Sequence, residues 1–301
     1  MRIAVAATPA VAIPTLNALL ASSHELISVI TKPDAPAGRG REMQASPVSH
    51  WAEVNSVRVF KPDSKEDLGG LVEGLDLVVT IGYGLLIPLE ILQIPRHGFI
   101  NLHFSLLPRW RGAAPVQRAI EAGDSITGVT VFQLDAGMDT GPIYQSAQIP
   151  LPSTTTSEHL FGLLAKLGVD PVIKTLDQIS KGVKPSEQSA VGVTRANKLS
   201  KEEGQIDWNS DAESILRKIR AFDPNPGAWS QFRGQVLKIN KARLSNESAP
   251  PAAFRSKEKS IFVGTSTSAL ELLEVTPAGK SQMQATSWAN GARLSADDLL
   301  Q

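Results

Sequence analysis

The first half of the chain alternates short apolar runs with stretches of helical periodicity. Apolar runs of strand length indicate strands buried on both faces, and their alternation with helices is typical of a parallel sheet with crossover helices. The expected strands are Arg2–Ala6, Glu25–Ile30, Val57–Phe60, Leu75–Ile81, Gly98–Phe104, Gly128–Leu134 and, at an edge, Ile143–Ile149. The expected helices are Ile13–Ala21, Ala113–Ala122 and, over Ser157–Ile179, either two helices or one helix broken near Pro171.

Two polar stretches interrupt this pattern. Between Pro33 and Pro47 the chain is rich in proline, glycine and mixed charges, which predicts a mobile surface loop without a regular element. From Gly182 to about Gly204 it is again polar and carries Pro185, which indicates an interdomain linker.

After this linker the pattern changes to one helix followed by short strands. The helix Asp211–Ala221 is expected to be capped by Ser210 or Asp211 and stopped by the prolines that follow it. The expected strands are Trp229–Phe232, Val236–Leu244, Ser260–Val263 and Ala269–Val275. Turn residues separate them at regular intervals, which predicts a small β-barrel or sandwich. We therefore expect a first domain at 1–183, a linker at 184–204 and a second domain at 205–301.

Composition narrows the class of protein. A chain of 301 residues with 42% apolar residues can bury two cores, and no apolar run approaches the length of a membrane span. The N-terminus reads as a strand rather than a signal peptide, and there is no cysteine, so a cytoplasmic protein without disulfides is expected. The 30 basic and 30 acidic residues cancel, which excludes a strongly basic nucleic-acid binder.

The candidate chemistry lies in the stretch Gly98–Gly112, GFINLHFSLLPRWRG. Side chains alternate along a strand, so Asn101 and His103 share one face while their apolar neighbours take the other. Burying two polar side chains on a strand costs free energy unless they form hydrogen bonds within the protein or with a ligand. Since ligands bind beyond the carboxyl ends of parallel strands, Asn101 and His103 are candidates for a ligand site.

A carboxylate to support the histidine is expected from LDAGMDTGP, which follows the strand Gly128–Leu134. Its glycines permit a tight loop in which Asp139 could approach His103. Asp135 is a competing carboxylate in the same loop, and a turn-forming role for either aspartate is equally compatible with the sequence.

Three pieces together resemble one family: Asn101-Leu-His103, the run Ser105–Pro108 with Gly112, and Asp139-Thr-Gly141. They are similar to the formyltransferases that use 10-formyltetrahydrofolate. The resemblance implies a Rossmann-like catalytic domain with a mostly parallel sheet, followed by a small C-terminal β-barrel of OB-like type.

Further stretches resemble the branch of this family that acts on methionyl-initiator tRNA. They are the loop Lys32–Gly40, Pro108–Gln117, Lys198–Trp208 and Ala221–Pro226. That branch implies initiator tRNA and folate as partners, a monomer and a tRNA-binding second domain. A formyltransferase acting on a sugar-nucleotide amine is the alternative. The branch usually begins Gly-Thr-Pro-Asp-Phe, so Ala7 and Ala10 are departures from it, but neither belongs to the candidate catalytic residues.

The resemblance also assigns roles to individual residues. Asn101, His103 and Asp139 are the expected catalytic residues: an oxyanion donor, a proton carrier and a carboxylate that orients the imidazole. The expected folate contacts are Ser105, Leu106, Leu107 and Pro108 with Leu85, Leu86 and Ile87. The expected tRNA contacts are Arg39, Arg41, Lys198 and Lys201.

The sequence argues against two other kinds of site. The remaining histidines, His24, His50, His97 and His159, show no ligand spacing with carboxylates, so no metal is expected. A glycine-rich dinucleotide motif does not follow the first strand, which makes a nicotinamide-dependent oxidoreductase the weaker use of this fold.

Overall fold

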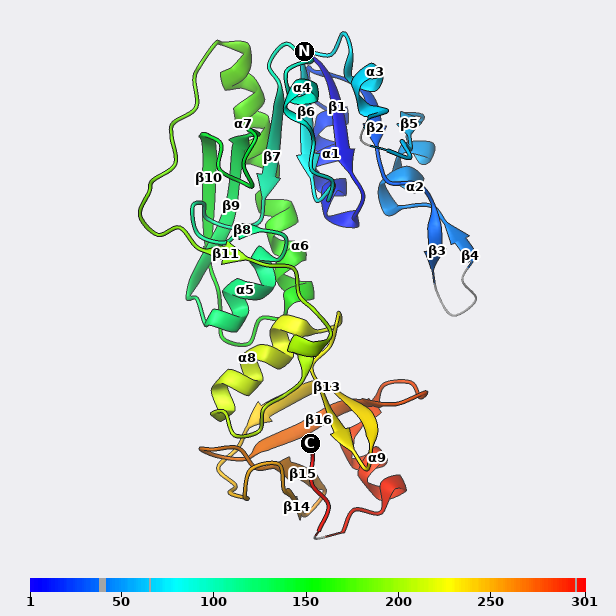
Figure 1. Cartoon of the computed structure of the whole chain (residues 1–301), viewed down its shortest axis with the longest axis vertical. Helices are drawn as coiled ribbons and strands as arrows, with labels where there is room; N and C mark the ends of the chain where they lie inside the picture. The colour runs from blue at the N-terminus through cyan, green and yellow to red at the C-terminus, as the bar shows by residue number, and fades with distance from the viewer. Residues whose placement is uncertain (38–41, 65, 296) are drawn as a thin grey trace. The chain divides into compact units, whose positions relative to one another are not determined.

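A computed structural model describes residues 1–37, 42–64, 66–295 and 297–301 (Figure 1). The chain forms two compact units. The first comprises Met1–Pro115, Ile126–Pro150 and Phe161–Ala196, and the second comprises Val116–Ser125, Leu151–Leu160 and Asn197–Gln301. Each unit is therefore made of three separate segments of the sequence. The domain limits expected from the sequence are continuous ranges, and they remain a prediction.

The first unit is built on a seven-stranded sheet in the order β10-β9-β7-β6-β1-β2-β5. Its strands are β1 (Arg2–Ala7), β2 (Glu25–Ile30), β5 (Arg58–Phe60), β6 (Leu77–Ile81), β7 (Phe99–His103), β9 (Ile126–Gln133) and β10 (Ile143–Pro150). The five strands from β7 to β5 are parallel, and β9 and β10 are antiparallel to their neighbours. The mostly parallel sheet expected from the apolar runs is confirmed.

Short helices lie between and after these strands in the sequence. They are a 3-10 helix (Ala10–Ala12), α1 (Ile13–Leu20), α2 (Pro47–Val54), α3 (Leu68–Val72), α4 (Leu89–Leu92), α5 (Pro115–Ala122), α6 (Ser157–Leu167) and α7 (Val169–Ser180). One core cluster joins buried residues of α3 and α4 to the central strands β1, β6 and β7. Among the described residues, no helix is long and apolar enough to cross a bilayer.

The region from Ser157 to Ile179 is two helices, one of the two expected arrangements. The break falls at Gly168 rather than at Pro171, which lies in the first turn of α7 where proline is tolerated. A Cβ added to Gly168 would lie 2.5 Å from the Leu102 side chain on β7. The helices therefore separate at a glycine that lies close against the sheet.

The loop prediction for Pro33–Pro47 is partly wrong. Within it, strands β3 (Ala35–Ala37) and β4 (Glu42–Gln44) form a two-stranded antiparallel sheet. All three residues of β4 are exposed, so the strand has no apolar alternation to reveal it, and its pairing with β3 supplies the stabilising hydrogen bonds. Helix α2 then begins at Pro47 behind the N-cap Ser46, a Ser-Pro pair that does mark a helix start.

The second unit is an antiparallel sheet with helices α8 (Ala212–Phe222) and α9 (Ala285–Ala292). The strand order is β12-β13-β16-β15-β14, with β17 also paired to β16. The bounds are β12 (Trp229–Phe232), β13 (Gln235–Leu244), β14 (Phe254–Lys257), β15 (Ser260–Val263), β16 (Leu270–Pro277) and β17 (Met283–Gln284). Asp211 caps α8 by accepting a hydrogen bond from the Ser214 amide, as one of the two expected caps.

The C-terminal residues join the two open edges of this sheet. Leu300 bridges Phe232 at the end of β12, and Leu299 bridges Ala253, which precedes β14. An aromatic cluster of Phe232, Phe254 and Trp288 packs between these elements, with ring centroids 5.1 to 5.8 Å apart. The curled sheet agrees with the expected small barrel. The sequence pattern predicts neither strand β14 nor helix α9. Strand β14 is polar and mostly exposed, so it lacks an alternating pattern.

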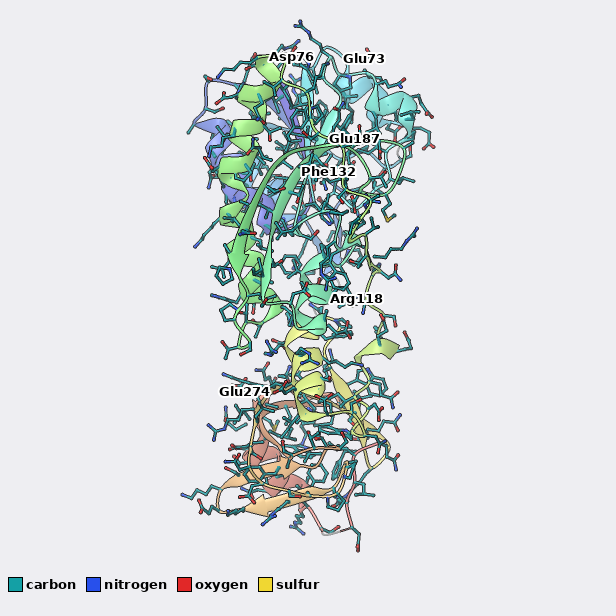
Figure 2. The ribbon with its side chains drawn as sticks, turned by 90° about the vertical axis from the view of Figure 1, so that its left-hand side faces the viewer. Glu73, Asp76, Arg118, Phe132, Glu187 and Glu274 are labelled. Carbon is teal, nitrogen blue, oxygen red and sulfur yellow. The ribbon has the colours of Figure 1, made fainter. Side chains whose placement is uncertain are left out.

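Helix α5 belongs to the second unit from Val116 onward, although it lies in the first half of the sequence. Arg118 (Figure 2) forms an ion pair with Glu203, with Nη2 and Oε1 2.8 Å apart. Arg217 of α8 donates from Nε to the carbonyl of Glu121 at 3.2 Å. These contacts join residues 85 and 96 positions apart in the sequence.

Candidate functional site

Asn101 lies in the middle of β7, between strands β6 and β9. The Thr80 hydroxyl on β6 donates its one proton to Asn101 Oδ1 at 2.8 Å, and the Ile100 carbonyl is a second, longer acceptor at 3.1 Å. This bond fixes which end of the amide faces the sheet. Among the described residues, none accepts a hydrogen bond from Asn101 Nδ2, so the NH₂ group is the donor that remains for a ligand.

His103 ends β7 and is buried, with 6% of its side chain exposed. Its Nε2 lies 2.8 Å from the Trp110 carbonyl, which can only accept, so Nε2 carries a proton. The ring meets Phe132 (Figure 2) edge-on, with centroids 6.3 Å apart. Nδ1 is therefore the ring nitrogen at which a proton can be gained or lost.

Asp139 lies beside this nitrogen. Its Oδ2 is 3.8 Å from His103 Nδ1 and accepts a hydrogen bond from the Gly112 amide at 2.7 Å. Asp135 instead accepts hydrogen bonds from Thr140 and from the Gly137 amide, and so shapes its own turn. Of the two competing carboxylates, Asp139 is the one that the fold places next to the histidine.

The loop Ser105–Pro108 follows β7, and hydrogen bonds to Arg109 and Thr130 hold it in place. Ser105 is fully buried and donates from its hydroxyl to the Arg109 carbonyl at 2.7 Å. Thr130 on β9 donates to the Ser105 carbonyl and accepts from the Leu107 amide. The Ser105 side chain thus holds the loop, and its hydroxyl faces protein rather than a ligand. Leu106 and Pro108 are half-buried, which leaves them as the accessible part of this loop.

Residues Leu85–Ile87 follow β6 in extended chain. Ile87 is buried, whereas Leu85 and Leu86 are 39% and 70% exposed. Among the described residues, none forms a hydrogen bond with the backbone groups of these three residues. Such backbone donors and acceptors beside apolar side chains suit a flat heteroaromatic ring. Tyr83, just before them, is packed in the core, and burial raises its pKa to about 12.

Of the four expected tRNA contacts, the structure describes two, Lys198 and Lys201. Lys198 and Lys201 are exposed residues of the second unit, and the Lys201 carbonyl accepts a hydrogen bond from Trp229. Arg39 and Arg41 lie outside the described residues.

The sequence did not reveal several residues that hold the cluster in place. Thr80 fixes Asn101, Gly112 donates to Asp139, and Arg111 and Gln188 bond to each other beside Asp139. Arg111 and Gly112 lie in a conspicuous PRWRG stretch, but Gln188 lies in a polar segment whose composition predicts a linker. No pattern in the sequence pointed to Gln188.

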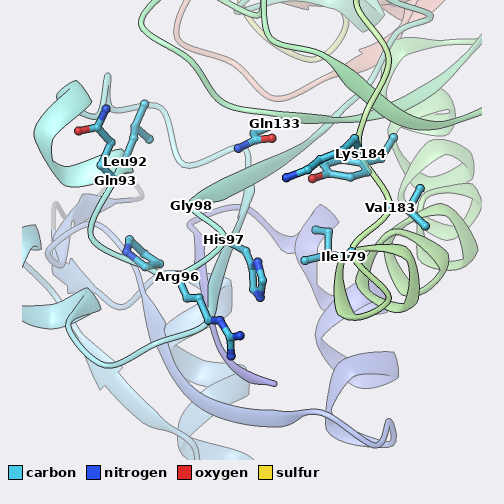
Figure 3. Close-up of a pocket in the computed structure, with 12 residues that line it drawn as sticks. Leu92, Gln93, Arg96, His97, Gly98, Gln133, Ile179, Val183 and Lys184 are labelled. Carbon is cyan, nitrogen blue, oxygen red and sulfur yellow. The ribbon is translucent and has the colours of Figure 1, made fainter.

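A cavity of about 350 Å³ opens at the other end of β7, where Gly98 precedes the strand (Figure 3). Arg96, His97 and Lys184 line it, and the described lining residues include no carboxylate. It is separate from the cluster at His103. Over the part of the chain that the structure describes, no group of three or more His, Cys, Asp or Glu residues is arranged as a metal site.

Comparison with known proteins identifies relatives over the whole chain. Residues 1–176 match the formyl transferase family, and residues 198–293 match the formyl transferase C-terminal domain. A methionyl-tRNA formyltransferase of Thermobifida fusca is 44% identical over 98% of this chain and 97% of its own. One of Salinispora tropica is 41% identical over the full length of both. The structure of WlaRD, a sugar 3N-formyl transferase in the presence of dTDP and 5-N-formyl-THF, superimposes with a TM-score of 0.70 at 20% identity, covering 93% of this chain and 99% of that one.

Proposed function

The chain belongs to the formyl transferase family, and on that premise we propose that it transfers a formyl group from 10-formyltetrahydrofolate to the α-amine of methionyl-initiator tRNA. The product is N-formylmethionyl-tRNA for translation initiation. The observation that carries this proposal is the 44% identity to a methionyl-tRNA formyltransferase along nearly the whole of both chains.

The side chains of the His103 cluster suit this reaction. The amine attacks the formyl carbon and negative charge develops on the formyl oxygen. The bond between the formyl carbon and N10 of the folate then breaks, so a proton must pass from the attacking nitrogen to N10. Asn101 is held by Thr80 with its NH₂ group outward, so it can donate to that oxygen without reorganising. His103 exchanges the proton at Nδ1, because Nε2 is bound to the Trp110 carbonyl.

Asp139 supports the histidine electrostatically. Its carboxylate lies 3.8 Å from Nδ1, where it can compensate the positive charge that develops on the ring during proton transfer. The substrate amine is itself the nucleophile, so the protein supplies orientation, charge and a proton carrier but no covalent attack.

The folate donor would lie along the exposed residues next to the cluster. Leu85, Leu86 and Ile87 offer backbone groups for the pteridine, and Leu106 and Pro108 offer apolar contact. Leu107 is buried, and Ser105 acts by shaping the loop. The donor supplies the formyl group when bound, and the chain orients it.

The alternative acceptor is a sugar-nucleotide amine. The likeness to WlaRD is a likeness of fold at 20% identity, whereas the tRNA enzymes share more than 40% of their residues with this chain. We expect mass spectrometry after incubation with 10-formyltetrahydrofolate to show one added formyl group on methionyl-tRNA and none on a dTDP-amino sugar. Formylation of the sugar alone would replace the proposed acceptor.

Arg39 provides a separate test of tRNA binding. By family resemblance it contacts the tRNA acceptor end, where a guanidinium can pair with phosphate or stack on a base. Arg39→Ala should raise KM or lower kcat for methionyl-tRNA and leave folate binding unchanged. The slope of log binding constant against log salt should weaken by about one phosphate contact.

The control for Arg39 is Arg58→Ala, which removes an exposed arginine from β5. It should leave the salt slope at the wild-type value. Equal slopes and equal kinetics for Arg39→Ala and wild type would remove Arg39 from the tRNA site; Arg41, Lys198 and Lys201 can be examined in the same way.

A further inference from the structure

Gln188 makes four hydrogen bonds that join the two loops around the His103 cluster. Its Nε2 donates to the carbonyls of Asp139 and Gly141 at 2.9 and 2.8 Å. Its Oε1 accepts from Nε and Nη2 of Arg111 at 3.1 and 2.7 Å. We propose that Gln188 is a positioning residue that fixes Asp139 beside His103. This inference rests on the proposed function.

The partners of Gln188 specify glutamine at this position. The two carbonyls only accept hydrogen bonds and the guanidinium only donates, so the amide has one orientation. A glutamate would turn an acceptor toward two carbonyls, and a lysine or arginine would face Arg111 with like charge. Only a side chain with a donor group and an acceptor at the same end satisfies all three partners.

These hydrogen bonds form a closed network around Asp139. Its carboxylate is held by the Gly112 amide, its carbonyl by Gln188, and Gln188 by Arg111, the residue before Gly112. Asp139 has a φ of 55°, a left-handed conformation that is uncommon for residues with a Cβ, although aspartate adopts it more often than most, and hydrogen bonds to the backbone add support to it. The Gln188 amide supplies that support on the backbone side, while Gly112 fixes the side-chain oxygen that lies next to His103.

The chain on both sides of Gln188 is anchored to the same loops. Ser186 forms two backbone hydrogen bonds with Ile143, the residue that begins β10. Further along, Thr194 pairs with Pro108 and Arg111, and β11 (Arg195–Ala196) pairs with β8 (Arg111–Gly112). Figure 1 shows this stretch passing from α7 to β11 beside β8. Gln188 is thus held at both ends and does not depend on a free loop for its position.

Loss of the amide should act on catalysis rather than on binding. The hydrogen bonds that Gln188 forms within the described residues go to Arg111, Asp139 and Gly141, so it holds the backbone of the loop that carries Asp139 rather than a residue proposed to bind folate or tRNA. Displacement of a catalytic group by about 1 Å can cost about a hundredfold in rate. We therefore expect a selective fall in kcat.

The first experiment compares Gln188→Met with Glu187→Met, which places the same side chain at the exposed neighbouring position (Figure 2). Formylation of methionyl-tRNA is measured at varied concentrations of each substrate. Gln188→Met should lower kcat by about 10- to 100-fold with both KM values unchanged. Glu187→Met should match the wild type. Wild-type kcat in folded Gln188→Met would overturn the positioning role.

The second experiment asks whether Gln188 acts through Asp139. In an Asp139→Ala background, adding Gln188→Met should produce no further loss of kcat, because the group it positions is already absent. Losses that multiply would overturn the proposal by showing a general structural effect. If Gln188→Met does not fold, Gln188→Glu keeps the shape and the bond to Arg111 and takes its place in both comparisons. Failure of the wild-type protein to formylate methionyl-tRNA would instead overturn the proposed function and this inference with it.

Discussion

Replacing His103 with alanine is expected to lower kcat for formyl transfer by at least about 10²–10³-fold. The buried imidazole has one nitrogen bound to the Trp110 carbonyl and the other facing Asp139, so the substitution removes the proposed proton carrier together with both of these contacts. Asn101→Ala should cause a loss of the same order, because it removes the NH₂ donor held by Thr80. Asp139→Asn keeps the shape of the side chain but removes the charge that supports the imidazolium, and should be similarly severe.

The matched control is His97→Ala, which removes a half-exposed histidine next to the start of the same strand. It should keep wild-type kcat. Each variant is first shown to fold by circular dichroism and thermal unfolding, and single-turnover formylation then isolates the chemical step. Near-normal turnover in folded His103→Ala, Asn101→Ala or Asp139→Asn would remove that residue from the mechanism.

Gly112→Ala is expected to damage both stability and catalysis. The glycine has φ of 125°, and a Cβ added there would lie 2.6 Å from the carbonyl oxygen of Ala196 on β11. Backbone strain and overpacking together should lower the free energy of unfolding by at least about 2 kcal/mol. Because the Gly112 amide binds Asp139, the shift of β8 away from β11 should also reduce kcat by about tenfold or more.

Gly192→Ala separates the two contributions. Gly192 precedes β11, the strand that contacts Gly112, and has a φ of 84°, but a Cβ there would meet no atom within 4 Å. This variant should show only the backbone cost of about 1–2 kcal/mol and no fall in kcat. Thermal unfolding and formylation rates of the two variants are compared below both melting midpoints. Equal stability and equal kcat would show that the contact between Gly112 and Ala196 does not constrain the site.

The sequence predicted the central sheet because strands buried on both faces must be apolar. Strands β1 and β6 are almost entirely buried and carry no alternation, so they stand out from their surroundings. The same reasoning fails for β4 and β14, whose exposed polar residues are held by pairing with a neighbour rather than by burial. A pattern of apolar positions cannot report a strand that buries little.

For the site, the sequence identified groups with chemistry but not the groups that position them. Asn101 and His103 stand out as polar residues on a buried strand, and the structure brings Asp139 to His103. Gln188 is a neutral residue in a polar stretch, and its importance comes from contacts with residues 49 and 77 positions away. Contacts over such separations depend on the completed fold, so a local pattern cannot show them.

The second unit combines residues 116–125 with the C-terminal part of the chain, and this has a consequence for synthesis on the ribosome. Arg118 and Glu121 are made well before their partners Glu203 and Arg217, which follow 85 and 96 positions later. At a translation rate of about 5–20 residues per second, these residues of α5 wait about 4 to 19 s for their partners. During that interval the surface of α5 that faces α8 is open to solvent and to other nascent chains. A pause in translation after residue 196 would lengthen this exposure, so the nascent protein should be most dependent on chaperones while the last third of the chain is being made.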